Sequence, residues 1–482
     1  MHNPSARYCD RRGFLSFASA GIGTAALVGL LGREGSLRAA PPGAVGPNAP
    51  PHHTPKAKRA IHITLCGGLS QVDSFDYKPS LEKFHGKSLG GSEKPDVFFG
   101  QVGLLRKNDW EFRQRGKSGL WISDLFPELA TVADELTVIN SMFAETSNHT
   151  PATFQENSGF RLNGFPVTGA WISHGLGSET DHLPAYVVIP DNRQHPAGGS
   201  INWTCGFLPA RHQGVIMRSR GAAIDDLAPA TPLDPAADRA SRELLAKLNA
   251  RHLANHGGED ALSARIRSYE LAAKMQVAVP EVADLEKESA EVQKLYGLDQ
   301  AASADFGRSC LLTRRLLERG VRFVQLYSGG AFASPRINWD GHENMKQNHG
   351  QEAARIDRPL AGLISDLRRR GMLDDTLLLF TSEFGRTPFA QSAADKVGEG
   401  RDHNQYGFSI WLAGAGLKHG LAYGATDEVG LKAVEKPVHW HDLHATVLHL
   451  LGIDHERLTF YHNGIQRRLT DVSGTVIKEI LA

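Results

Sequence analysis

The sequence predicts an α/β fold built on a largely parallel β-sheet. Short apolar runs alternate along the chain with amphipathic helical stretches, which is the pattern of strand–helix–strand units. Glycines punctuate this alternation, because Gly67-Gly68 follows the first run and Gly371 and Gly452 close two helical stretches. Six strands are therefore expected, at residues 60–66, 136–141, 185–190, 321–327, 376–381 and 408–413.

The helical stretches are clear in three places. Residues 353–370 and 441–451 repeat apolar side chains at helical spacing, and 285–296 is charged on most faces, as expected of a surface helix. The middle of the chain, about 195–300, differs, because it joins a loop rich in Gly and Pro to a long charged helical stretch at 238–296. We interpret this middle region as an insertion or cap over the sheet.

The first forty residues are typical of a twin-arginine signal peptide. Arg11-Arg12 precedes a weakly apolar run, 14–31, that is rich in Ala and Gly. We expect recognition by the twin-arginine translocase and export to the periplasm or cell envelope, with an uncleaved anchor as the alternative, since the run is about the minimum length for a membrane span. Residues 41–59 are expected to be a flexible tether, and 60–482 the folded domain.

Composition excludes some classes of function. The 53 Lys and Arg balance the 53 Asp and Glu, so the chain has no electrostatic footprint for nucleic acid. Besides Cys9 in the signal there are only Cys66, Cys205 and Cys310, and an odd number at wide spacing predicts no disulfide framework.

Histidines and carboxylates gather at the ends of the predicted strands. In order along the chain they are Asp73, Asp76, His149, Asp340, His342, Glu383 and His403. Open parallel sheets bind ligands at the carboxyl ends of their strands. One such Asp is more often a helix N-cap than a ligand, but clusters after several strands predict a metal site. Mixed imidazoles and carboxylates suit Zn, Mn or Mg better than Ca.

The C-terminal half resembles the alkaline phosphatase superfamily, which includes sulfatases and cofactor-independent phosphoglycerate mutases. Residues 357–385 follow the sulfatase order of a helix, a Leu-Asp-Asp-Thr step at 373–376, a strand and then Thr-Ser-Glu-Phe-Gly, where sulfatases have Ser-Asp-His-Gly. The helix at 441–453 resembles the sulfatase Asp-Leu-x-Pro-Thr helix, and Asp340-Gly341-His342 is similar to a metal-binding motif of the mutases.

The whole chain after the signal resembles DUF1501, a family of uncharacterised exported bacterial proteins that is plentiful in planctomycetes and placed in the same superfamily. The matching segments are Gly67–Asp76, Trp339–His342, Ser382–Pro388, Gly400–His403 and the end from residue 454. Of these, Ser-Glu-Phe-Gly-Arg-Thr-Pro at 382–388 is the most specific.

This resemblance implies a three-layer α/β/α fold and a site with one or two divalent metal ions that polarises a phosphate or sulfate ester, of which a polysaccharide ester is one candidate. Two ions about 4 Å apart would clamp the attacking and leaving oxygens. On this analogy Asp73 or Asp76, after the first strand, would be a bridging metal ligand, and Asp340 and His342 would hold one ion. Glu383 would take the place of the sulfatase aspartate, and His403 would complete the site. Arg386 would bind an anionic oxygen bidentately, unless it serves as a surface or helix-capping residue.

Two departures from the sulfatase pattern limit the analogy. His149 stands where the nucleophilic cysteine would be, which excludes a formylglycine sulfatase and leaves Thr150 or Ser147 as a hydroxyl nucleophile. Phe384 stands in place of a metal-binding histidine. The chain therefore uses one metal, recruits another histidine such as His349, or has abandoned catalysis.

Two functions follow from these features. The first is a metal-dependent hydrolase of phosphate or sulfate esters, in which the middle region would set substrate choice. The alternative is a catalytically degenerate exported protein that retains the fold as a binding or cell-envelope scaffold.

Overall fold

The computed structural model describes residues 51–90, 95–227, 234–255, 260–331 and 336–482. The predicted signal and the first part of the tether lie outside the described residues, which belong to one compact unit. Residues 51–58, the rest of the expected tether, are held in place: the amides of Lys56 and Ala57 both donate to the carbonyl of Leu450 at 2.8 Å. In the described ranges, no helix combines the length and the apolar character that a membrane crossing requires.

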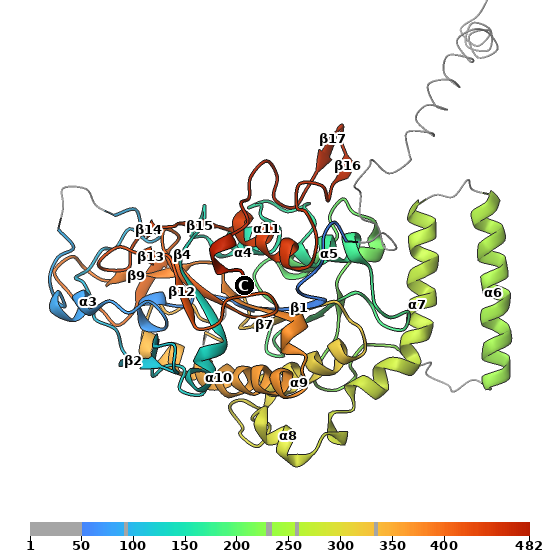
Figure 1. The fold of residues 1–482 in the computed structure, drawn as a ribbon, viewed down its shortest axis with the longest axis horizontal. Helices are drawn as coiled ribbons and strands as arrows, with labels where there is room; N and C mark the ends of the chain where they lie inside the picture. Colours follow the sequence, from blue (N-terminus) through green and yellow to red (C-terminus); the bar gives the residue numbers. More distant parts are fainter. Residues whose placement is uncertain (1–50, 91–94, 228–233, 256–259, 332–335) are drawn as a thin grey trace, which may run out of the picture. The chain divides into compact units, whose positions relative to one another are not determined.

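A nine-stranded sheet organises this unit (Figure 1). Its main path runs β12-β4-β11-β8-β1-β7-β5-β6, with β15 beside β4. Every pairing is parallel except those of β11, which runs antiparallel to β4 and β8. The strands are β1 (Arg59–Leu65), β4 (Leu136–Phe143), β5 (Tyr186–Ile189), β6 (Val215–Ile216), β7 (Phe323–Ser328), β8 (Thr376–Ser382), β11 (Phe408–Gly414), β12 (Leu421–Tyr423) and β15 (Val438–His439). All six predicted strands are confirmed. The strands of this sheet that the sequence did not predict, β6, β12 and β15, are short.

Helices cover both faces of the sheet, which makes three layers (Figure 1). On one face lie α4 (His149–Ser158), α5 (Thr168–Leu176) and α11 (Trp440–Leu450), and on the other α9 (Ala304–Glu318) and α10 (Met345–Arg369). The predicted α/β class with a largely parallel sheet is confirmed.

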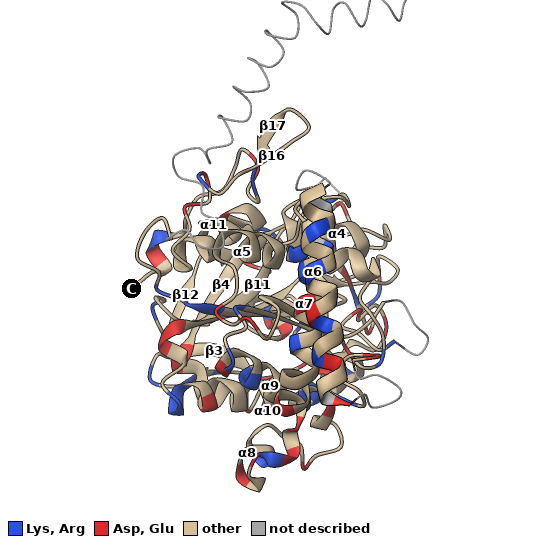
Figure 2. Cartoon of the chain, turned by 90° about the vertical axis from the view of Figure 1, so that its right-hand side faces the viewer, with Lys and Arg blue, Asp and Glu red and all other residues tan. Residues whose placement is uncertain are grey.

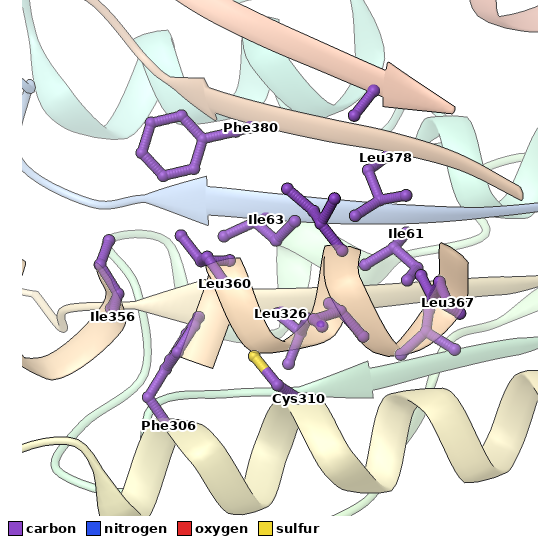
Figure 3. Close-up of a cluster of buried hydrophobic side chains, with 14 of the residues drawn as sticks. Ile61, Ile63, Phe306, Cys310, Leu326, Ile356, Leu360, Leu367, Leu378 and Phe380 are labelled. Carbon is purple, nitrogen blue, oxygen red and sulfur yellow. The ribbon is translucent and has the colours of Figure 1, made fainter. Parts of the chain in front are cut away.

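The alternation of side chains along β1 explains why both faces need cover. Ile61, Ile63 and Leu65 pack toward α9 and α10, in the cluster that Figure 3 draws with Phe306, Leu360 and neighbouring apolar side chains. Ala60 and Cys66 point to the opposite face and join the core under α5 and α11. A parallel strand buried on both sides is usually a nearly continuous apolar run, and after its first residue β1 departs from this only at His62 and Thr64, which are buried as well.

The middle region adds to the sheet and extends beside it. It supplies the edge strand β6, which pairs with β5, and then the long helices α6 (Pro235–Asn255) and α7 (Asp260–Ala283). Arg315 of α9 donates to the carbonyls of Glu281 and Val282, which fixes the end of α7 to the helical layer. Figure 2 shows basic and acidic residues mixed along α6 and α7.

The expected surface helix at 285–296 is shorter than predicted. A 3₁₀ turn at Leu285–Lys287 is separated by Glu288 and Ser289 from α8 (Ala290–Leu295), which Ser289 caps by accepting from the amide of Val292. Leu285 and Tyr296, at its two ends, are buried. The prediction of one surface helix over 285–296 is therefore corrected to a 3₁₀ turn followed by a short helix.

Small elements surround the carboxyl edge of the sheet. They are α3 (Pro79–Lys83) and the two-stranded pairs β2 (Phe112–Arg115) with β3 (Leu120–Ser123), β9 (Gly385–Ala390) with β10 (Arg401–Asn404), and β13 (Ala425–Thr426) with β14 (Ala433–Glu435). A further pair, β16 (Phe460–His462) with β17 (Ile465–Arg467), lies near α5 instead, where the rings of Phe460 and His174 are 5.6 Å apart (Figure 1). The pair β9–β10 follows β8 directly and brings residues 401–404 back to the end of the central strands.

The turn after β1 is where the loops meet most closely. Gly67 has φ +119°, and a Cβ there would lie 2.4 Å from the amide nitrogen of Asp340 and 2.6 Å from that of Trp339. The absence of a side chain thus lets the loop after β7 lie directly on the turn after β1.

We expect Gly67→Ala to lower the free energy of unfolding by about 3 kcal/mol or more, because backbone strain and a backbone clash add. Gly86→Ala is the matched control: it also has a positive φ, +76°, but nothing lies within 4 Å of its Cβ position. Urea unfolding of both variants measures the difference, and equal losses would contradict the close-approach argument.

Candidate metal centre

Four predicted residues meet at the carboxyl edge of the sheet. His149 opens α4 just after β4, Asp340 and His342 lie in the loop after β7, and His403 lies in β10. One ligand atom from each can be chosen so that all four lie within 4.8 Å of one another, and all four residues are buried. Asp340 Oδ1 lies 2.7 Å from Nε2 of His342, 3.2 Å from Nε2 of His403 and 3.4 Å from Nε2 of His149.

Outer hydrogen bonds fix the orientation of each imidazole. His149 Nδ1 lies 2.8 Å from Glu383 Oε1, and His403 Nδ1 lies 2.6 Å from the carbonyl oxygen of Ser147. The carbonyl oxygen of Ser147 can only accept, so Nδ1 of His403 carries the proton and Nε2 of His403 turns its lone pair toward Asp340. His149 lies between two carboxylates, with Nδ1 facing Glu383 and Nε2 facing Asp340. His342 Nδ1 bonds the side chain of Gln391 in the same way. This outer support is characteristic of metal-bound histidines.

The donor set fits one metal ion. Three imidazole nitrogens and one carboxylate oxygen face one another, and either shared protons or one metal ion between them offsets the buried negative charge. Ligands at about 2.0–2.1 Å from a tetrahedral zinc ion are about 3.3 Å apart, close to the observed separations. Three nitrogens favour Zn or Mn over Mg, which prefers oxygen.

The pKa shifts within the group also indicate that it attracts positive charge. Burial raises the pKa of Asp340, but Arg386 and the three imidazoles outweigh it and hold that pKa well below its ordinary value. Burial lowers the pKa of His149, yet its hydrogen bonds to Asp340 and Glu383 raise it overall. Burial and the nearby Arg386 hold the pKa of His403 well below its usual range. At neutral pH the carboxylate is therefore ionised and His403 neutral, while the raised pKa of His149 favours its protonated form. The group thus attracts either a proton or a metal ion.

Arg386 does not have the predicted role of binding an anionic substrate. Its guanidinium is fully buried and donates to the carbonyls of Gly67 and Gly68, the latter at 2.9 Å, and to Asp340 Oδ1 at 2.8 Å. Arg386 therefore joins the turn after β1 to the ligand Asp340. It is a positioning residue for the site.

Asp73 and Asp76, predicted to bridge from β1, lie apart from the group. Asp73 forms a buried ion pair with Arg401 at 2.8 Å and accepts from Ser70 and from the amide of Asp109. Asp76 pairs with Lys78 at 3.1 Å and accepts from Thr426. Both carboxylates are used to fix the loop after β1, so the prediction that they bind metal is corrected.

Glu383 stands behind His149 instead of among the four ligand atoms. One oxygen, Oε1, accepts from the amide of Gly67 at 2.7 Å and bonds His149 Nδ1.

Thr150, the predicted nucleophile, is the second residue of α4 and is half-buried. A pocket of about 230 Å³ that reaches His403 is lined by Ser147 but not by Thr150. The geometry thus favours Ser147 of the two hydroxyls.

Neither Phe384 nor His349 belongs to the group of four ligands. The ring of Phe384 packs 4.5 Å from that of His403 and 5.0 Å from that of His149, so it forms part of the wall of the site. His349 is not recruited, because its Nε2 accepts from the amide of Ser70 at 3.1 Å, and burial lowers its pKa to about 3. Among the described residues, one group of ligands forms.

Sequence reasoning missed three contributors to the site. Gln391, which holds His342, carries no signal of its own in the sequence. Phe98 and Phe99, whose rings lie against the ligands, had one available signal: two adjacent aromatic residues outside any predicted strand or helix.

Comparison with known proteins identifies the family. The model of the family described as "Protein of unknown function (DUF1501)" matches residues 57–481. The chain belongs to the DUF1501 family. The match includes all four residues of the group, so this arrangement lies inside the shared domain of DUF1501. A search of curated proteins finds no match.

Solved structures with 10–12% sequence identity align with most of this DUF1501 chain. The lipoteichoic acid synthase LtaP from Listeria monocytogenes is 10% identical, with 85% of this chain and 76% of that chain covered and a TM-score of 0.35. The alkaline phosphatase from the Antarctic bacterium TAB5 is 11% identical (78% and 96%, TM-score 0.35), and the sulfatase PsFucS1 from Pseudoalteromonas sp. 12% (83% and 68%, TM-score 0.35).

We expect the purified chain to retain a stoichiometric divalent ion, measured by elemental analysis. His342→Ala removes a ligand and abolishes retention, whereas Glu383→Gln removes only the support behind His149 and weakens affinity about 10–100-fold. His85→Ala, at an exposed histidine outside the group, is the control. If Glu383→Gln abolished binding as completely as His342→Ala, Glu383 would be a ligand.

Proposed function

We propose that this chain binds one zinc or manganese ion through His149, Asp340, His342 and His403 and hydrolyses phosphate or sulfate esters. The observation that carries the proposal is the convergence of three imidazole Nε2 atoms on one carboxylate oxygen. Each histidine is also held at Nδ1 by a second hydrogen bond, which is the outer support that metal-bound histidines have. When bound, the ion supplies Lewis acidity that polarises an ester oxygen.

The chain's own residues prepare the site for this chemistry. Glu383, Ser147 and Gln391 hold the three imidazoles in one orientation, so little reorganisation is needed when substrate enters. Arg386 fixes Asp340 Oδ1, and Arg336 pairs with Oδ2 of the same carboxylate. These two cations hold Asp340 ionised and stationary.

Ser147 is the proposed nucleophile, with Thr150 second. Ser147 lines the pocket at His403, and its own carbonyl holds that ligand. The hydrogen bond between the Ser147 carbonyl and His403 therefore positions both the proposed ligand and the segment that carries the Ser147 hydroxyl.

A second candidate function is metal binding without turnover. It is favoured by one observation: Arg386, the cation that the superfamily resemblance assigns to substrate, is occupied by backbone carbonyls and Asp340. On this alternative the chain would be a binding or cell-envelope protein that retains the fold.

Turnover of p-nitrophenyl phosphate and p-nitrophenyl sulfate separates the two candidates. We expect metal-dependent hydrolysis of at least one ester, with kcat/KM reduced about 100-fold or more in Ser147→Ala and by less than about threefold in Thr150→Ala. Metal analysis of each variant is the control for lost binding. Stoichiometric metal with no hydrolysis of either ester would support the second candidate.

We also propose export by the twin-arginine translocase to the periplasm or cell envelope, supported by Arg11-Arg12 and the apolar run after it. Conservative Arg11→Lys and Arg12→Lys substitutions together keep the charge but remove the arginine pair. We expect this double variant to stay in the cytoplasm, as measured by cell fractionation, while the parent chain leaves it. Equal export of both chains would refute the twin-arginine route.

A further inference from the structure

Two neighbouring phenylalanines cover the ligand group from the outside. Phe98 is 43% exposed and Phe99 53% exposed, yet each ring lies against an imidazole. The ring centroids are 4.8 Å apart for Phe98 and His403, and 4.8 Å apart for Phe99 and His342. The two phenylalanine rings meet edge to face at 4.9 Å. Large apolar side chains exposed together at a polar site indicate contact with a ligand.

The phenylalanine pair is attached to the ligand-bearing strand. The amide of Phe99 donates to Oδ2 of Asp402 at 2.9 Å, and the amide of His403 donates to Oδ1 of the same carboxylate at 2.7 Å. One buried carboxylate thus holds both the aromatic pair and a proposed metal ligand. This link fixes Phe98 and Phe99 relative to the site.

The pocket beside Phe98 leads to His403. It has a volume of about 230 Å³ and is lined by Asp96, Val97, Phe98, Ser147, His403, Gln405 and Tyr406. The rings of Phe98 and Tyr406 contribute apolar surface, while Ser147 and Gln405 offer hydrogen-bonding groups. Tyr406 donates its hydroxyl proton to Asp96 at 2.9 Å. No lysine or arginine is among these described lining residues, and Lys432 Nζ lies behind the pocket wall, 5.9 Å from the centroid of the Tyr406 ring.

We propose that this pocket receives the uncharged organic group of the ester, a ring-sized group with an apolar face, and that Phe98 and Phe99 select it. The inference rests on the proposed metal site and names its substrate class. The anionic head would lie at the metal group, while the organic group contacts the phenylalanine rings. An organic group with its own negative charge would meet the Asp96 carboxylate, and no cation is among the described residues that line the pocket. The same two rings shield the metal group from water.

Binding of two phosphonates tests the selection without requiring turnover. Phenylphosphonate carries an uncharged ring, whereas phosphonoacetate carries a second anionic group. Calorimetry on the metal-loaded chain should therefore show that phenylphosphonate binds at least about tenfold more tightly than phosphonoacetate. In Phe98→Ala/Phe99→Ala this preference should fall to within about threefold. Equal affinities in the parent chain, or a preference that survives the double substitution, would overturn the proposal.

Chelation kinetics supply a readout that does not depend on a substrate. We expect the double variant to lose its ion to excess EDTA about tenfold faster than the parent chain, because the covering rings are gone. Tyr461→Ala, which removes an aromatic ring that is 65% exposed on β16, is the matched control and should not change the rate. An unchanged rate in the double variant refutes the shielding role.

These outcomes separate this inference from the proposed function. A chain that holds no stoichiometric metal would refute the proposed site itself. A chain that holds metal but binds both phosphonates equally would refute only the role of Phe98 and Phe99. Circular dichroism of the double variant checks that the substitutions have left the fold intact.

Discussion

The buried ion pair between Arg386 and Asp340 is the interaction on which the rest of the site depends. The guanidinium is withdrawn from water, and its remaining donors satisfy the carbonyls of Gly67 and Gly68. Removing one partner of such a pair leaves an uncompensated buried charge, which costs about 3–5 kcal/mol. The pair therefore fixes two loops at once: the turn after β1 and the loop after β7 that holds two proposed ligands.

Much of this arrangement could be predicted from the sequence because it follows from local patterns. Apolar runs located the six main strands, and parallel strands bring their carboxyl ends to one edge. His149, Asp340 and His342 follow those strands within a few to about fifteen residues, so their convergence needed only the correct order of elements. His403 was predicted from its place before β11, and the hairpin β9–β10 brings it to the same edge.

The rest depends on partners that lie far away in the sequence. Asp73 was predicted as a ligand, but its partner Arg401 is 328 residues away, and no local pattern shows that the carboxylate is already paired. Arg386 was assigned to substrate because a free arginine and a buried one look alike in the sequence. Phe98 and Phe99 contribute only through the fold, since their contacts with His403 and His342 join a loop to distant segments.

The central position of β1 determines when this protein can acquire its tertiary structure. β1 is the first strand to be synthesised, yet its neighbours β7 and β8 begin at residues 323 and 376. During translation it therefore has no partner until most of the polypeptide has left the ribosome, and such non-local pairing is slow and leaves strand edges exposed. The contact between Gly68 and Arg386 spans 318 residues. The proposed metal ion would therefore bind at this edge only after translation, and its capture and the last stage of folding would stabilise each other.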